Sequence, residues 1–371
     1  MRWGGLAAVI AALSVAACAT PYEHGPIPPG YPPPAPPAPR PPPEAPRIVE
    51  VSQLPGWAGE DHDAAFEAWR ATCQASRERG PADLCVRARS LGAIAPGQGR
   101  AFLEQAFVAE RIGEAGVLTA YFAPIYPARR QPDAEFSAPV RPKPADLVVA
   151  DGGIVLRVLP DGSAEPYPDR AAIEATPVDK PLAWMRPEEL FFLQVQGSGV
   201  LTFEDGRRMK ALYAAHNGRP FQGIANPMRD RGLLARDNTG GEAIRGWLAT
   251  HRGPEADEIM RLNPRYAFFR LAPDDGKPPV GAANIPLPAG RAVAVDPAFH
   301  PYGELLWLDA EAPLLAGAFP AYRRLAMALD TGGAIKGEAR ADLYLGEGAA
   351  AGAEAGRVRH ALRLYRLVPR P

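Results

Sequence analysis

The stretch that decides the fold is residues 325–356, LAMALDTGGAIKGEARADLYLGEGAAAGAEAG. An apolar run ends at Asp330, the segment Thr331-Gly332-Gly333 lets the backbone turn tightly, and a second apolar run brings Asp342. Short apolar runs bounded by glycine are typical of buried strands. Because glycine lets a ligand or another backbone approach closely, carboxylates at these strand ends are candidates for an open groove. The alternative is that both aspartates only cap turns and that Lys336 is solvated.

Outward from this stretch, the C-terminal part of the chain reads as a series of short strands. Apolar or alternating runs with glycine-rich turns between them predict strands over residues 292–296, 304–309, 325–330, 341–345 and 361–367. Strands at this spacing indicate a small barrel. Further strands are expected over 117–125 and 154–158. Apolar residues at helical spacing predict helices over 61–79, with Gly80 as the stop, and over 100–112, and further helices over 241–251 and from Pro187 and Pro254.

Other catalytic patterns fit this chain poorly. Asp330-Thr331-Gly332 matches the active-site turn of aspartic proteases, but the chain holds one such tripeptide, so the shared-proton pair would require a symmetric dimer. The segment Gly197-Ser198-Gly199 lacks the glycine spacing of a nucleophile elbow, and phosphate-loop, dinucleotide and HExxH motifs are missing. The six histidines are scattered singly, so we expect neither a metal site nor a cofactor.

The first residues read as an export signal. Arg2 supplies a positive charge, residues 4–15 are apolar, and small residues precede Cys18. This order predicts a signal peptide over residues 1–17, too short to span a bilayer as a lasting helix. The small-small-Cys pattern resembles a bacterial lipobox, in which Cys18 would be lipidated and become the mature N-terminus. The alternative is a soluble secreted protein with a chance cysteine.

A proline-rich segment follows, and residues 18–47 are expected to form a spacer. Of the 26 residues from 21 to 46, 14 are proline. Such a stretch buries no core and favours an extended polyproline conformation. At about 3.1 Å per residue its reach is roughly 80 Å, which would lift a folded domain clear of a membrane.

Charge and cysteine content narrow the class of protein. The chain has 371 residues with 41 basic and 42 acidic side chains, so nothing indicates a nucleic-acid partner. Besides Cys18, the cysteines are Cys73 and Cys85. In an oxidising compartment these two form a candidate disulfide.

Ordered blocks along the globular part resemble the membrane-bound lytic murein transglycosylase A family, whose C-terminal module is called 3D after its three aspartates. Besides residues 325–356, the blocks are Trp69 with Cys73, GVLTAYF at 116–122, FFLQVQGSG at 191–199, AHNG at 215–218, NP at 263–264 and VDP at 295–297. The last block supplies Asp296 as the first of the three aspartates. The blocks keep their order over most of the chain after the spacer.

This resemblance implies a mainly β fold with several helices. Residues 48–125 together with 280–371 would form a double-psi β-barrel, and residues 126–279 an inserted β-rich substrate-binding domain. The substrate groove would lie between the two.

The resemblance also implies the reaction. Lytic transglycosylases cut the β-1,4 bond between N-acetylmuramic acid and N-acetylglucosamine without water, and the muramyl C6 hydroxyl closes a 1,6-anhydro ring. One carboxyl group can serve first as general acid and then as base. By its place in the motif this group would be Asp342, with a pKa raised by burial. The alternatives are an inverting glycan hydrolase, which needs a second carboxylate, and a lipoprotein that only binds cell wall.

The implied partners are peptidoglycan glycan strands, with no nucleic acid, and any cell-wall machinery that recruits the protein is left unidentified. Ala19 after the cysteine favours, by resemblance, the periplasmic face of the outer membrane, with Cys18 as the anchor. The residues expected to bind substrate or to assist Asp342 are Thr119, Tyr121, Gln194, Gln196, Ser198, Asp296, Asp330 and Lys336.

Overall fold

The computed structural model describes residues 48–236, 238–315 and 317–371. The expected signal peptide, the lipidated Cys18 and the proline-rich spacer lie outside the described residues. Within the described ranges, no helix combines the length and the apolar character needed to cross a membrane.

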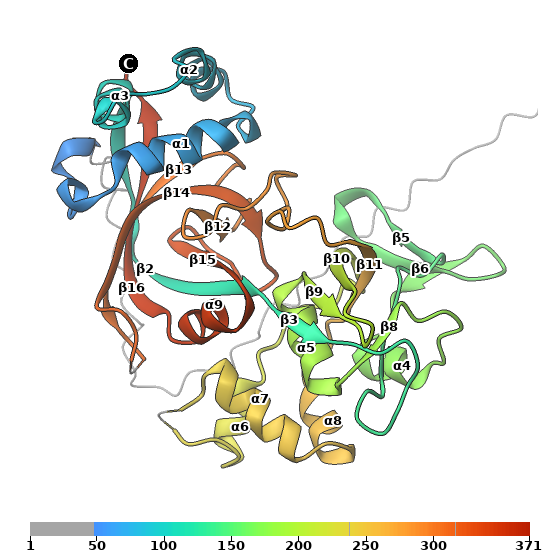
Figure 1. Ribbon diagram of the computed structural model, residues 1–371. Helices are drawn as coiled ribbons and strands as arrows, with labels where there is room; N and C mark the ends of the chain where they lie inside the picture. The colour runs from blue at the N-terminus through green and yellow to red at the C-terminus, as the bar shows by residue number, and fades with distance from the viewer. Residues whose placement is uncertain (1–47, 237, 316) are drawn as a thin grey trace, which may run out of the picture. The chain divides into compact units, whose positions relative to one another are not determined.

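Six strands close into a barrel (Figure 1). Around the ring they are β2 (Phe107–Ala123), β15 (Arg340–Glu347), β12 (Ala292–Val295), β14 (Ala321–Thr331), β13 (Leu305–Pro313) and β16 (Arg359–Pro369), and β16 pairs back with β2. β2 runs parallel to β15 and β12 parallel to β14, whereas the other four pairs of the ring are antiparallel. A short strand, β1 (Ile48–Glu50), extends the sheet along β2. The closed barrel confirms the fold class expected from the glycine-punctuated strands.

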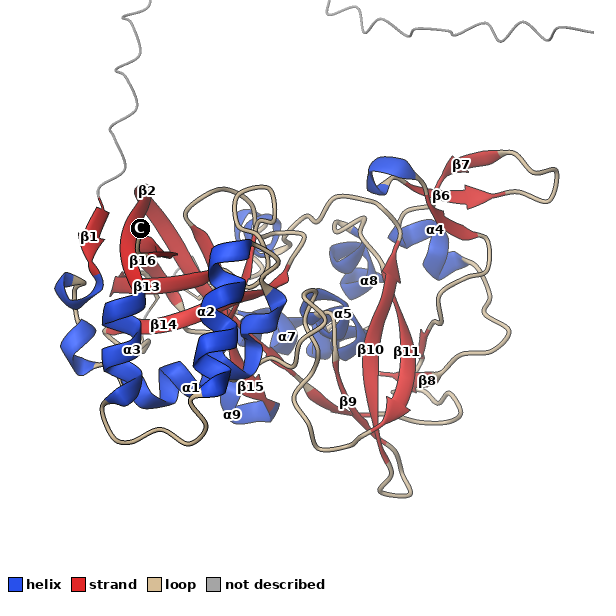
Figure 2. Ribbon diagram, turned by 90° about the horizontal axis from the view of Figure 1, so that it is seen from above, coloured by secondary structure: helices blue, strands red, loops and turns tan. Residues whose placement is uncertain are grey.

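Alternation along the barrel strands divides the core into two parts. Leu306 and Leu308 of β13 belong to one buried cluster with Val293 of β12, while Leu305 and Trp307 belong to another. Successive side chains of a strand point to opposite faces of a sheet, so each strand feeds both clusters. The cluster with Trp307 is completed by helices, since α1 (His62–Thr72) packs on β14 (Figure 2).

The helical cover differs from the expected helices in two places. The helix predicted over 61–79 ends at Thr72, and Gly80 lies inside a second helix, α2 (Arg79–Ser90). The helix predicted over 100–112 is wrong beyond Ala106, because α3 (Gln98–Ala106) gives way directly to β2. Residues 108–110 pair with both β16 and β1, and this pairing overrides the helical spacing of the apolar residues. The sulfurs of Cys73 and Cys85 are bonded, with the two Cα atoms 5.5 Å apart.

Residues between β2 and β12 form a second β-rich part. Its main sheet has the order β11 (Ala267–Pro273), β10 (Arg208–His216), β9 (Gly199–Thr202) and β3 (Ile125–Pro127). Two smaller sheets are β4 (Ala138–Val140) with β8 (Ala183–Met185), and β5 (Leu147–Val149) with β6 (Val155–Val158) and β7 (Ala164–Pro166). Its helices are α4 (Arg170–Ala175), α5 (Pro187–Gln196), α6 (Ala225–Asp230), α7 (Gly241–Thr250) and α8 (Pro254–Arg261). The helices predicted from Pro187, Gly241 and Pro254 are confirmed. A last helix, α9 (Gly348–Ala355), joins β15 to β16.

Candidate active site

Four barrel strands bring one row of residues together. Thr119 of β2 is the register partner of Asp342 of β15, Asp342 is the partner of Ala294 of β12, and Ala294 is the partner of Asp330 of β14. Register partners on neighbouring strands point to the same face of a sheet. The two aspartates therefore flank a small alanine, and Asp342 also lies beside a threonine hydroxyl.

Asp342 is held by a directed chain of hydrogen bonds. The Arg340 guanidinium donates to Thr119 Oγ1 over 2.8 Å, and the Thr119 hydroxyl donates to Asp342 Oδ1. A guanidinium only donates, so the single hydroxyl hydrogen of Thr119 is free to point at the aspartate. Burial raises the pKa of the Asp342 carboxyl, and the charge of Asp330 adds to the rise, against the lowering effects of Thr119 and Arg340.

Asp330 has a partner for each carboxylate oxygen. The Tyr121 hydroxyl donates to Oδ2 over 2.7 Å, and the backbone N–H of Ala282 donates to Oδ1 over 3.0 Å. Gly281 permits this approach, since a Cβ there would lie 2.5 Å from the Leu329 carbonyl oxygen. Burial raises the pKa of the Asp330 carboxyl despite these hydrogen bonds. Two carboxyl groups with raised pKa values thus lie on one face of the barrel wall.

Asp296 serves a different purpose from the other two aspartates. Its carboxylate accepts hydrogen bonds from the N–H groups of Gly337 over 3.0 Å and Ala298 over 3.3 Å, and the Lys336 ammonium lies 3.5 Å away. The Gly337 bond is the largest cause of the lowered pKa of Asp296, so this carboxylate stays ionised. Asp296 therefore ties the loop of residues 332–339 to the turn after β12. The Lys336 side chain is largely exposed.

The QVQGSG segment supplies residues of two kinds. The Gln194 side chain is bonded inside the second β-rich part, since it accepts from Arg170 over 2.7 Å and donates to the Ala267 carbonyl over 3.3 Å. Gln196 instead reaches the barrel strand, where its Oε1 accepts from the Phe122 N–H over 3.1 Å. Ser198 follows the end of α5 and is partly exposed. The structure brings Gln196, but not Gln194, to the strand that carries Thr119.

Sequence reasoning missed Arg340. A residue two positions before Asp342 on the same strand points to the same face, so period-two spacing was the signal that could have found it. Arg340 also donates to the carbonyl oxygens of Ala341 and Val117, which fixes its guanidinium beside Thr119.

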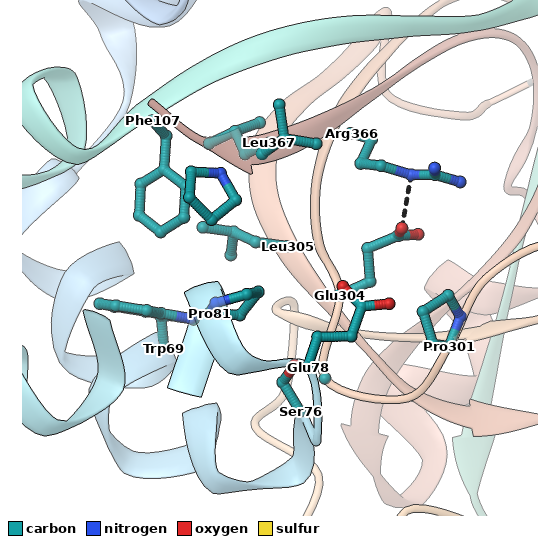
Figure 3. A pocket seen from close by; sticks show the side chains of 13 residues that line it. Trp69, Ser76, Glu78, Pro81, Phe107, Pro301, Glu304, Leu305, Arg366 and Leu367 are labelled. Carbon is teal, nitrogen blue, oxygen red and sulfur yellow. Dashed lines mark ion pairs between the residues drawn. The ribbon is translucent and has the colours of Figure 1, made fainter. Parts of the chain in front are cut away.

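A small cavity of about 40 Å³ lies elsewhere, lined by residues such as Trp69, Phe107 and Leu305 (Figure 3). It contains none of the expected site residues. Over the described ranges, no group of three or more His, Cys, Asp or Glu side chains is arranged to hold a metal ion.

Two family models match the chain. The family model described as the MltA specific insert domain matches residues 117–270, and the 3D domain model matches residues 291–368. Membrane-bound lytic murein transglycosylase A of Escherichia coli K12 is 33% identical over 261 residues, which are 68% of this chain and 66% of that protein. The aligned part therefore spans just under two thirds of that curated relative.

Solved structures cover more of the chain. The membrane-bound lytic murein transglycosylase of Agrobacterium tumefaciens superposes with a TM-score of 0.75 at 33% identity, covering 87% of this chain and 97% of that one. E. coli MltA with bound chitohexaose superposes with a TM-score of 0.63 at 27% identity, covering 89% of this chain and 93% of that one. The chain belongs to the membrane-bound lytic murein transglycosylase A family.

Proposed function

We propose that this protein is a peptidoglycan lytic transglycosylase that cleaves the β-1,4 bond between N-acetylmuramic acid and N-acetylglucosamine without water. The observation that carries the proposal is the Arg340–Thr119–Asp342 chain, which orients one carboxyl group whose pKa is raised. The names of the relatives and the chitohexaose bound by the E. coli protein support a glycan substrate.

The first step is proton donation by Asp342. Because Asp342 Oδ1 accepts the Thr119 hydrogen, the acid proton resides on Oδ2. Oδ2 gives this proton to the glycosidic oxygen while the bond from that oxygen to the muramyl C1 breaks. The N-acetylglucosamine part leaves as an alcohol, and Asp342 becomes a carboxylate. Thr119 and Arg340 stabilise this carboxylate, since both lower the Asp342 pKa.

The second step returns the proton. The muramyl C6 hydroxyl attacks C1 and closes the 1,6-anhydro ring, and Asp342 Oδ2 accepts the hydroxyl proton. No water is consumed, and Asp342 ends protonated as it began. The opposing influences on the Asp342 pKa suit both roles. Burial favours the protonated acid, and the hydrogen bond from Thr119 together with the charge of Arg340 stabilises the ionised carboxylate.

An inverting hydrolase is the second candidate, and the nearness of Asp330 favours it. That reaction needs a second carboxylate to activate a water molecule. Both Asp330 oxygens already accept hydrogen bonds, from Tyr121 and from Ala282, and burial favours the neutral acid. These contacts suit Asp330 to stabilising the site rather than to activating water.

The remaining expected residues complete the proposal. We place the sugar-binding face along β2 and the QVQGSG segment, with Asp296 shaping the loop of residues 332–339. The residues concerned are Thr119, Tyr121, Gln194, Gln196, Ser198 and Lys336. Of these, Gln194 would act by ordering Gln196 and Ser198, because its own amide is bonded to Arg170 and Ala267.

Domain organisation and location follow the same proposal. The barrel would be the catalytic domain, built from residues 48–125 and 280–371, with residues 126–279 as the substrate-binding insert. Lipidation of Cys18 and the proline-rich spacer would hold the enzyme on the periplasmic face of the outer membrane, within reach of the wall.

Substitution of the acid tests the assignment. Asp342→Asn keeps the size and the hydrogen bond from Thr119 but cannot donate an acidic proton, so turnover of purified peptidoglycan should fall by at least about 10²-fold. Asp230→Asn, at an exposed aspartate of α6, is the control and should retain full turnover. Undiminished turnover by the Asp342→Asn protein would overturn the assignment.

A further inference from the structure

One buried histidine of the barrel has no part in the mechanism described above. His300 lies in the turn after β12 and is fully buried. Its Nδ1 lies 2.6 Å from Glu304 Oε2, and its Nε2 lies 2.6 Å from the backbone carbonyl oxygen of Glu338. Glu338 belongs to the loop of residues 332–339, which connects the strand of Asp330 to the strand of Asp342.

Counting protons on this contact fixes the state of the ring. A backbone carbonyl only accepts hydrogen bonds, and an ionised carboxylate likewise only accepts. Glu304 forms an ion pair with the Arg366 guanidinium, whose Nε lies 2.5 Å from Glu304 Oε1 (Figure 3). Both ring nitrogens of His300 must then carry hydrogen, which makes the ring an imidazolium.

The contact at Glu338 lies beside another tie on the same loop. The backbone N–H of the neighbouring Gly337 donates to the carboxylate of Asp296. The backbone N–H of His300 donates to the Asp296 carbonyl over 3.0 Å. Farther along, the Ala339 carbonyl accepts from the Val117 N–H over 3.1 Å. Three consecutive residues of the loop are therefore fixed to the barrel immediately before Arg340.

We propose that His300 is a positioning residue: its imidazolium clamps Glu338 and so holds the start of β15, with Arg340 and Asp342, in the geometry that the reaction needs. The clamp rests on the proposed role of Asp342, although its structural part can be measured without turnover. After loss of the second ring proton, the Glu304 carboxylate and the Glu338 carbonyl compete for one N–H, and the charged acceptor binds it more strongly, so the clamp on Glu338 weakens at higher pH.

The charged groups around the ring set the direction of this pH dependence. Burial and the charge of Arg366 lower the pKa of His300. The hydrogen bonds to Glu304 and Glu338 and the charge of Glu304 raise it by more, so the pKa of His300 is raised overall. The other charged groups on the adjoining turn and loop are Asp296, Lys336 and the Glu338 carboxylate. A group with a raised pKa contributes its stabilisation at low pH and loses it as pH rises through the folded-state pKa.

Hydrogen exchange tests the clamp directly. In the Asp342→Asn protein, whose residue 342 no longer titrates, exchange of the Gly337 amide should accelerate about tenfold, beyond the intrinsic pH effect, as pH rises through the His300 pKa. His300→Phe in the same background should exchange rapidly at every pH. His360→Phe is the matched control, because His360 is equally buried in β16 but bonds to the Phe319 carbonyl. It should leave the Gly337 amide unchanged.

Kinetics on the otherwise unmodified protein supply the second readout. His300→Phe should lower kcat about tenfold with little change in KM, and His300→Gln, which keeps one donor for Glu338, should recover part of that loss and depend less on pH. A kcat and Gly337 exchange rate for His300→Phe equal to those of His360→Phe would overturn the proposal. If the unmodified protein failed to cleave peptidoglycan, the proposed function would fail, while the exchange experiment would still decide whether the clamp exists.

Discussion

The Thr119 hydroxyl donates its hydrogen bond to Asp342 Oδ1 across the parallel strands β2 and β15, where the two residues are register partners. They are 223 positions apart in the chain, so the contact exists only because β2 and β15 pair in the folded protein. Parallel pairing holds both backbones, and Arg340 sets the direction of the hydroxyl. The acid therefore has a defined orientation before any substrate is bound, which is the condition for efficient proton transfer.

Removing the Thr119 hydroxyl should lower turnover and shift its pH dependence. Thr119→Val deletes the hydrogen bond that lowers the Asp342 pKa, so this pKa should rise and the alkaline fall of kcat/KM should move to higher pH. Lost orientation should cost about tenfold in kcat. Thr119→Ser keeps the hydroxyl and is the control. The prediction fails if the pH profile of the Thr119→Val protein coincides with that of the unmodified one.

Tyr121→Phe should destabilise the barrel through Asp330. The substitution leaves Asp330 Oδ2 without the Tyr121 donor, at a cost of about 1–3 kcal/mol in the free energy of unfolding. Urea denaturation provides the measurement.

Tyr344→Phe is the matched control for that substitution. The rings of Tyr121 and Tyr344 are 5.3 Å apart, and within the described part of the chain the buried Tyr344 hydroxyl has no hydrogen-bond partner. Removing that hydroxyl should change the free energy of unfolding little. Equal losses for the two variants would contradict the assigned role of the Tyr121–Asp330 bond.

Asp296 should stabilise the fold in a way that acid abolishes. Its pKa is lowered in the folded protein, so its stabilisation is present above the unfolded pKa of about 3.9 and is lost as pH falls through the folded value. Asp296→Asn should therefore reduce the free energy of unfolding by about 1–2 kcal/mol at neutral pH and by less in acid. Urea titrations of the unmodified and Asp296→Asn proteins at neutral and acidic pH measure this free energy. A loss of stability on substitution that was larger in acid than at neutral pH would contradict the prediction.

Cys18 should determine where the protein is found. Cys18→Ser removes the thiol that would be lipidated, and with it the acyl chains that would hold the protein at the membrane. Membrane and soluble fractions of cells that export each form should show the unmodified protein in the membrane and the variant in the soluble periplasm. A variant that stayed in the membrane fraction would contradict the anchor.

The strands near the C-terminus could be predicted because their sequences are short, apolar and bounded by glycine. The expected strand over 292–296 corresponds to β12, and that over 325–330 lies inside β14. β2 was recognised only in its second half. Its first half includes the polar residues Glu110, Arg111 and Glu114, and it is a strand because β16 pairs with it, which local sequence does not reveal.

Some residues of the candidate site could likewise be predicted from the sequence, and others could not. Asp330 and Asp342 could be found from glycine spacing, and Thr119 and Tyr121 from resemblance to a family. Period-two spacing from Asp342 places Arg340 on the same strand face, but its contact with Thr119 could not be predicted, because it forms only on folding. The same holds for the contact of His300 with Glu338. Gln194 shows the converse, since its motif is evident in sequence while its amide is bonded within the second β-rich part.

The mass of the products tests the central claim most directly. Purified peptidoglycan digested by the protein in ¹⁸O-labelled water should release fragments that end in 1,6-anhydromuramic acid, lighter by one water than reducing-ended fragments and free of the label, because the C6 hydroxyl and not water attacks C1. Fragments with reducing ends that carry the heavy oxygen would contradict the proposed reaction and identify the protein as a hydrolase.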